Sequence, residues 1–425
     1  MRRLSSYLSI AVYLSWWLLA TYSLPVSAQE NRHFPRGSHS IFIAKSSGMR
    51  TDLLNRLAPI IEQSIANGDY PGAVLLIGHQ GKIVYRGVFG SRRILPREAP
   101  MRFDTVFDLA SLTKILATAP AIMQLIEQNK LVLDAPVARY WPGFARQGKS
   151  RITIRELLTH TSGLPPEVKA ASKEAVLREI EEIKPAHQPG TTFLYSDVNF
   201  ITLQHLIELV SGEMLDTYVK KHIFVPLGMK KTSFLPPTSW KDGVAPTELI
   251  ANKLRWGEVQ DPLAAAMGGV SGAAGLFSTA SDIGIYAQSL LDGGRLPTKK
   301  NKPGDYLLGP LTVRKMTSPQ TPVAMHEARG LGFDLDSPYS NRGVLFSTTS
   351  FGHSGWTGTS LWIDPESKTW IIFLTSRAHP SPRLHNQVVE DRRAIANIVA
   401  ASITDINAYQ AVNTGPGELY RAYSV

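Results

Sequence analysis

Apolar and polar positions follow different periods at the ends of the chain and in its middle. The apolar residues between Leu53 and Ile65 recur with the period of 3.6 that is typical of a helix facing a core. Two runs rich in β-branched residues follow, 73–78 and 83–89, on either side of a turn at Gln80-Gly81. The first part of the chain is therefore predicted to form a helix followed by a β-hairpin.

A second hairpin with its own helix is predicted near the end of the chain. The runs 359–363 and 370–375 flank a short polar turn, and a helical pattern covers about 386–403. Helical patterns dominate the sequence between the two hairpins. The simplest architecture is α/β (α+β): an antiparallel sheet built from both chain ends and flanked by helices, with a mainly helical region inserted in the middle.

The N-terminal residues have the pattern of a secretory signal peptide. Arg2 and Arg3 precede an apolar run at about 8–19, and small residues up to Ala28 offer a cleavage site. This run is short for a membrane span, which needs roughly 20 residues. We expect an exported protein, periplasmic or extracellular, with membrane attachment only if the leader stays uncleaved.

The whole chain is predicted to consist of one folded domain with short flanking segments. Its parts are a signal peptide (1–28), a polar linker (29–48), the domain itself (49–403) with its sheet part at about 49–115 and 270–403 and its helical part at about 116–269, and a tail (404–425) without a recognisable pattern.

Composition narrows the classes of partner. Lysine and arginine exceed acidic residues by 45 to 35, and loss of the two leader arginines lowers the net charge from +10 to +8. Such a charge favours association with an anionic cell wall, although solubility alone explains it equally well.

Cysteine is absent, which excludes disulfides and thiolate metal sites, and no H-E-x-x-H occurs. We expect no metal, no other cofactor and no nucleic acid partner.

The main candidate for chemistry is the pair Ser111 and Lys114, at the junction between an apolar run and a helix. Side chains at i and i+3 of a helix are neighbours, so Lys114 can reach the Ser111 oxygen. Serine attacks when a base removes its proton, and lysine can be that base if burial lowers its pKa from roughly 10.4. An S-x-x-K pair alone is more often a solvated helix face, so its context decides.

Two further stretches provide context. Tyr195 stands just ahead of a helix and could carry a proton, because a phenol near a lysine cation ionises more easily; a core tyrosine is the alternative. The stretch with His353, Gly355 and Trp356 leads into a strand, and its backbone N–H groups could hold an oxyanion. A bulged turn would explain its glycines equally well.

Together the three stretches resemble the serine β-lactamase and penicillin-binding protein superfamily, in which a serine-x-x-lysine opens a helix, a tyrosine motif lies on the helical region and a short motif ending in glycine lies on a strand. The likeness covers nearly everything from Met49 to about Ile403. Within the superfamily the chain is most similar to secreted class C-type hydrolases, closest to an exo-acting muropeptide amidase and esterase-like subgroup.

This resemblance implies a role for each site residue. Ser111 is the nucleophile, Lys114 its base and Tyr195 the relay that protonates the leaving group, while the N–H groups of Ser111 and Trp356, next to Gly355, form an oxyanion hole. Asp197 stands where many members have an asparagine. A carboxylate cannot donate a hydrogen bond, so we expect Asp197 to bind differently and to pair with Lys114.

Three further departures from the family pattern concern substrate binding. His353 replaces a lysine, and since its charge fades near pH 6.5 it should anchor a substrate carboxylate more weakly than lysine does. Gln260 and Ala273 stand where the subgroup has histidines. The sequence does not determine how these two replacements change the shape of the substrate pocket.

The implied function is a secreted serine hydrolase that acts through an acyl-enzyme on amide or ester bonds, foremost those of cell-wall muropeptides. A carboxylesterase, a D-amino-acid peptidase or a weak β-lactamase of the same fold would suit the same residues. A wall-binding homologue without turnover is the alternative of another class.

One rival motif points to nucleotides. Gly143 to Ser150 matches the phosphate-binding pattern G-x-x-x-x-G-K-S/T. A true phosphate loop follows a buried strand and opens a helix, whereas Trp141-Pro142 precedes this one and the next helix is predicted to begin later, at the capping box from Thr153 to Glu156. We therefore expect no nucleotide partner.

Overall fold

The computed structural model describes residues 39–44, 48–297, 305–337, 340–383 and 386–406. The predicted signal peptide (1–28) lies outside these residues, as do most of the predicted linker and most of the tail. Within the described ranges, no helix has the length and apolar character needed to cross a membrane.

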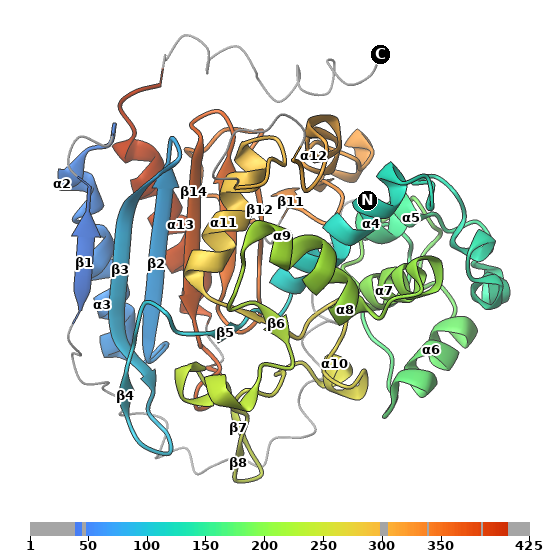
Figure 1. The fold of residues 1–425 in the computed structure, drawn as a ribbon, viewed down its shortest axis with the longest axis horizontal. Helices are drawn as coiled ribbons and strands as arrows, with labels where there is room; N and C mark the ends of the chain where they lie inside the picture. Colours follow the sequence, from blue (N-terminus) through green and yellow to red (C-terminus); the bar gives the residue numbers. More distant parts are fainter. Residues whose placement is uncertain (1–38, 45–47, 298–304, 338–339, 384–385, 407–425) are drawn as a thin grey trace, which may run out of the picture.

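One antiparallel sheet, built from both ends of the chain, forms the centre of the molecule (Figure 1). The N-terminal hairpin pairs β2 with β3 and the late hairpin pairs β13 with β14, while β14 lies beside β2 and joins the two hairpins. The predicted fold class is confirmed. In spatial order the strands are β1 (Ser40–Ile43), β3 (Lys82–Arg93), β2 (Gly72–His79), β14 (Thr369–Thr375), β13 (Ser360–Asp364), β12 (Phe351–Ser354), β11 (Asp334–Asp336) and β10 (Ala328–Arg329), with β4 (Ala99–Pro100) on β3.

Helices cover both faces of this sheet, which explains why its central strands are apolar on both sides. Every residue of β2 and of β14 is buried. A strand buried on both faces has near-continuous apolar sequence and no clean alternation. The helices are α2 (Thr51–Leu54), α3 (Leu57–Asn67) and α13 (Gln387–Ser402) on one face, and α11 (Ala280–Leu291) on the other.

Two details differ from the sequence-based expectation. The helix predicted over Leu53 to Ile65 is broken into α2 and α3, because Pro59 has no N–H for the Asn55 carbonyl and its ring collides with that carbonyl in a continuous helix. Ser40–Ile43, inside the stretch predicted as a linker, forms the edge strand β1 on β3.

The middle of the chain forms a helical region beside the sheet (Figure 1). Two small sheets are separate from the central one. The first has the order β5 (Phe107–Asp108), β9 (Leu276–Ser278) and β6 (Ser233–Phe234), and the second pairs β7 (Leu249–Ile250) with β8 (Lys253–Leu254). The helices of the inserted and connecting segments are α4 (Ala119–Glu127), α5 (Ile154–Leu158), α6 (Lys173–Glu182), α7 (Asp197–Ser211), α8 (Leu215–Val219), α9 (Val225–Leu227), α10 (Pro262–Ala266) and α12 (Pro310–Met316).

Candidate active site

Ser111 lies in a sharp turn between strand β5 and a helical segment. The Lys114 N–H donates to the Ser111 carbonyl at 3.1 Å, which closes one tight turn, and a π-helical turn, Lys114–Thr118, continues into α4. The predicted helix start is therefore present, with a narrow first turn and a wide second one. π-turns within helices occur frequently at functional sites.

The residue before Ser111 has an unusual backbone conformation. Ala110 has a φ of 46°, a left-handed conformation that a residue with a Cβ adopts at a cost of about 1–3 kcal/mol. Two side chains hold it there. Asp108 Oδ1 accepts the Ala110 N–H at 2.9 Å, and Thr113 Oγ1 donates to the Ala110 carbonyl at 2.6 Å. This turn directs Ser111 towards the helical region.

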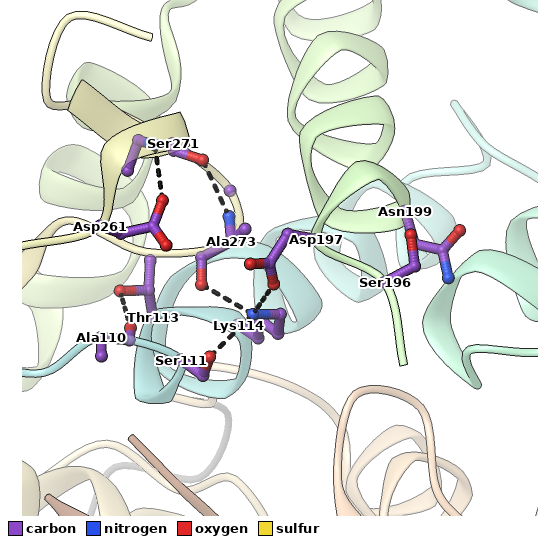
Figure 2. Close-up of polar contacts among 12 residues, drawn as sticks. Ala110, Ser111, Thr113, Lys114, Ser196, Asp197, Asn199, Asp261, Ser271 and Ala273 are labelled. Carbon is purple, nitrogen blue, oxygen red and sulfur yellow. Dashed lines mark hydrogen bonds and ion pairs between the residues drawn. The ribbon is translucent and has the colours of Figure 1, made fainter. Parts of the chain in front are cut away.

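Lys114 is fully buried and contacts three groups of the site (Figure 2). Its Nζ donates to Ser111 Oγ at 3.0 Å and to the Ala273 carbonyl at 2.9 Å, and it lies 2.6 Å from Asp197 Oδ1. Asp197 is the first residue of α7. The expected contacts of Lys114 with Ser111 and with Asp197 are thus both present in the structure.

The protonation state of Lys114 depends on whether burial or its neighbours have the larger effect on its pKa. Burial does act to lower the pKa of Lys114, but Asp197 and Tyr195 oppose it through charge and hydrogen bonding, and the net effect raises the pKa to about 12. The condition under which Lys114 would be a direct base, a pKa lowered by burial, is therefore not met, because Asp197 on α7 stabilises the charged form. Lys114 is therefore an ammonium group in the resting protein.

Tyr195 lies over Lys114 and against a buried histidine. The Lys114 Nζ is 5.0 Å from the centre of the tyrosine ring, and the His160 ring stacks on Tyr195 with centres 4.3 Å apart. The Ser196 N–H donates to His160 Nδ1 at 3.1 Å. Burial, with Arg329 and Lys114 nearby, holds the pKa of His160 well below its usual value, so His160 is neutral.

His353 is also neutral, which corrects the expected partial charge near pH 7. Burial, aided by the positive charges of Arg329 and Lys114, places the pKa of His353 well below 6.5. Its Nδ1 is 2.8 Å from the Ser354 carbonyl, a contact that requires a proton on Nδ1. His353 therefore carries a neutral, buried acceptor at Nε2, which has no hydrogen-bond partner among the described residues, where the family motif has a cation.

The turn between β12 and β13 packs directly against the Ser111 turn. Thr357 and Thr359 donate to the carbonyls of Asp108 and Leu109 at 2.7 and 3.0 Å. A Cβ on Gly355 would lie 2.4 Å from the Leu109 carbonyl oxygen, so only glycine permits this approach.

Two backbone donors remain available beside the serine. Within the described part of the chain, neither the Ser111 N–H nor the Trp356 N–H donates a hydrogen bond to the protein. Both donors could therefore bind an oxyanion, as the resemblance implied.

Asp108, which the sequence analysis left without a role, links the Ser111 turn to the loop before α10. Its Oδ2 accepts the Gln260 N–H at 2.7 Å, while its Oδ1 holds Ala110. The Gln260 side chain donates to Glu248 at 3.2 Å, and Ala273 contributes its carbonyl to Lys114. In the sequence, the sign of this role was that Asp108 is an acidic residue inside an otherwise apolar strand.

The phosphate-loop motif serves a structural purpose. Lys149 Nζ donates to the carbonyls of Glu181 and Ile183 at 2.8 and 2.7 Å, and its side chain is buried. The capping box is present, with the Thr153 side chain accepting the Glu156 N–H and the Glu156 side chain accepting the Thr153 N–H. Lys149 ties this loop to the end of α6 and does not point to a bound phosphate.

Comparisons with known proteins agree with this fold. The family model described as Beta-lactamase matches residues 57–394. A protein of Escherichia coli (strain K12) named "Putative D-alanyl-D-alanine carboxypeptidase" is 32% identical over 378 residues, which cover 79% of this chain and 85% of that protein. The "N-acetylmuramyl-L-alanine amidase" of Bacillus subtilis (strain 168) is 32% identical over 381 residues, covering 80% of this chain and 84% of that one.

A solved structure shows the same architecture. The penicillin-binding protein homolog from Caulobacter crescentus has a TM-score of 0.66 at 23% identity and covers 85% of this chain and 99% of its own. The chain belongs to the β-lactamase family, within the serine β-lactamase and penicillin-binding protein superfamily, and is a hydrolase of that group.

Proposed function

We propose that this protein is an exported serine hydrolase that forms an acyl-enzyme on Ser111 and cleaves amide or ester bonds of cell-wall muropeptides. The observation that carries the proposal is the position of Lys114 Nζ between Ser111 Oγ at 3.0 Å and Asp197 Oδ1 at 2.6 Å. A hydroxyl, an amine and a carboxylate in contact form a path along which the serine proton can leave.

Lys114 acts in this proposal as a relay. Because Lys114 rests as an ammonium group, it accepts the Ser111 proton only as it passes one of its own to Asp197. The Ser111 oxygen then bonds to the substrate carbonyl carbon, and the carbonyl oxygen becomes an oxyanion held by the N–H groups of Ser111 and Trp356.

The leaving group departs when the carbon–nitrogen or carbon–oxygen bond breaks. Tyr195, which lies over Lys114, passes the proton from the Lys114–Asp197 pair to the leaving atom. A water molecule then attacks the acyl-enzyme, the same groups take up and return its proton, and the acid product and free Ser111 are released. Each of these steps is assigned to Ser111, Lys114, Asp197, Tyr195 and the two backbone N–H groups.

The substrate class rests on the relatives. The Escherichia coli relative is named a putative D-alanyl-D-alanine carboxypeptidase and the Bacillus subtilis relative an N-acetylmuramyl-L-alanine amidase, and each is 32% identical to this chain over the aligned residues. A neutral His353 also weakens the case for efficient β-lactam binding, which a lysine cation at that position would favour. Carboxylester hydrolysis remains the second candidate, since the same acyl-enzyme serves it.

An activity panel on purified protein tests the proposal. We expect N-acetylmuramoyl peptides to be hydrolysed with a higher kcat/KM than short acyl esters, and a chromogenic β-lactam to be the poorest substrate. Fastest turnover of the esters would favour the carboxylesterase, and fastest turnover of the β-lactam would overturn the assigned substrate class. Absence of turnover, with binding to wall fragments retained, would identify a non-catalytic binding protein.

A further inference from the structure

We infer that Arg377 and Trp356 form a subsite that binds a carboxylate of the substrate. This inference rests on the proposed function and specifies its substrate as an acyl compound that bears a free carboxylate near the scissile bond. It also assigns the anchoring charge to a different residue from the one that the family motif uses.

Arg377 follows β14 and is attached to the turn that carries the Trp356 N–H. Its backbone N–H donates to the Thr357 carbonyl at 2.9 Å, and its Nη1 donates to the Trp356 carbonyl at 3.3 Å. The guanidinium carbon lies 4.9 Å from the centre of the Trp356 ring, and Trp356 is 38% exposed. The guanidinium and indole groups therefore lie together beside the proposed oxyanion hole.

The other cations near this turn already have partners. Lys114 pairs with Asp197 at 2.6 Å, and the buried Arg329 pairs with Asp334 at 3.4 Å. The buried Arg392 donates to the carbonyls of Gly355 and Thr359, and it supports the turn from within. Carboxylates of the protein therefore balance the charges of Lys114 and Arg329, and backbone carbonyls accept the hydrogen bonds of Arg392.

Arg377 differs from these cations. Among the described residues, no acidic side chain forms an ion pair with it, and burial is the cause that lowers the pKa of its guanidinium. A guanidinium keeps its charge even so, and it presents N–H pairs that match a carboxylate. On the turn that carries the Trp356 N–H, a half-buried cation without a counter-charge is stabilised when a substrate carboxylate supplies that charge.

The test uses matched substrates that differ only in one charge. The first pair is N-acetylmuramoyl-L-alanine and its C-terminal amide, and the second is 4-nitrophenyl hemisuccinate and its methyl ester. The variants are Arg377→Gln, which can still donate to the Trp356 carbonyl but carries no charge, and Arg377→Lys. Arg178→Gln is the control, because Arg178 is exposed on α6 at the outer edge of the helical region (Figure 1).

We expect wild type to prefer the charged member of at least one pair, and Arg377→Gln to reduce that preference about 10-fold or more, mainly through KM. Arg377→Lys should keep part of the preference and Arg178→Gln all of it. An equal loss on charged and neutral members in Arg377→Gln would show a purely structural arginine and overturn the inference, as would an unchanged preference or a wild type with no preference in either pair. Hydrolysis of the 4-nitrophenyl esters without hydrolysis of the muramoyl compound would contradict the proposed function, while the ester pair still decides the role of Arg377.

Discussion

Lys114 Nζ lies 2.6 Å from Asp197 Oδ1, and this ion pair determines the protonation state of the proposed catalytic lysine. Lys114 is fully buried, whereas 25% of the Asp197 side chain is exposed. Burial alone would move the lysine towards its neutral form, and the aspartate reverses that effect. The two residues therefore act as one unit, within which a proton can pass from the lysine to the aspartate.

The first prediction follows from removing the aspartate charge. In Asp197→Asn the burial effect is no longer opposed by that carboxylate, so the pKa of Lys114 should fall from about 12 into the measurable range. The kcat/KM of the variant should then rise with pH as Lys114 loses its proton and becomes a direct base. Wild type should lack this rise of kcat/KM with pH, because its ion pair keeps Lys114 protonated at those pH values.

The measurement is kcat/KM for a neutral ester over roughly pH 6 to 10, the range in which the shifted ionisation would be seen. Identical profiles for wild type and Asp197→Asn would contradict the relay. Asp197→Glu, which keeps the charge, serves as the matched control, and its kcat/KM should show no such rise with pH.

The second prediction concerns stability in acid. His160 is buried and neutral in the folded state, with a pKa held well below 6.5, whereas in the unfolded chain it takes up a proton near 6.5. The unfolded state thus binds more protons below about pH 6.5, and the free energy of unfolding should fall by about 1.4 kcal/mol per pH unit for this group as the pH drops. Above that pH its contribution is fully present.

The variant His160→Asn tests this dependence. Asparagine tolerates the φ of 58° at this position and can accept the Ser196 N–H, but it does not titrate. Urea unfolding between about pH 5 and 7 should show a shallower pH slope for the variant than for wild type, with a difference that approaches one proton towards pH 5. Parallel slopes would show that His160 does not titrate on unfolding.

The third prediction concerns the close packing of Gly355 against the Ser111 turn. A Cβ on Gly355 would approach the Leu109 carbonyl to 2.4 Å and Thr359 Oγ1 to 2.3 Å, so Gly355→Ala should displace the turn that carries the Trp356 N–H. Loss of one oxyanion donor lowers kcat by about 10²–10³. Gly243→Ala is the control, because a Cβ there meets nothing within 4 Å. A Gly355→Ala protein with normal kcat would show that this close approach does not position the site.

Local sequence predicted much of this molecule. The two hairpins and the position of Lys114 beside Ser111 depend on period-2 and i, i+3 relationships within short segments, and such relationships are visible in the sequence. The capping box from Thr153 to Glu156 is equally local and is present in the structure.

Tertiary effects account for what the sequence did not predict. The charge of Lys114 depends on Asp197 from α7, and the neutrality of His353 depends on its burial near Arg329 and Lys114. The left-handed Ala110 could not be inferred, because alanine rarely adopts this conformation and here does so with the help of Asp108 and Thr113. The position of Arg377 on the turn likewise depends on the register of the sheet.

Export is a separate prediction that rests on the N-terminal sequence. Cleavage after Ala28 should give a mature protein that begins at Gln29 and is found outside the cytoplasm. Intact-mass measurement on protein from cell fractions checks this. A membrane-bound species that keeps Met1 would instead identify an uncleaved anchor.

The central claim is that Ser111 forms a covalent acyl-enzyme, and intact-mass spectrometry with a fluorophosphonate or slow acyl ester tests it most directly. We predict one added acyl or phosphonyl mass on wild type, located at Ser111 by peptide mapping, and none on folded Ser111→Ala, which should also lose turnover. Lys114→Ala should slow labelling strongly, and the double variant should lose little more activity than either single one, since the two residues act as a unit. Labelling of folded Ser111→Ala at the wild-type rate, with turnover retained, would contradict the account.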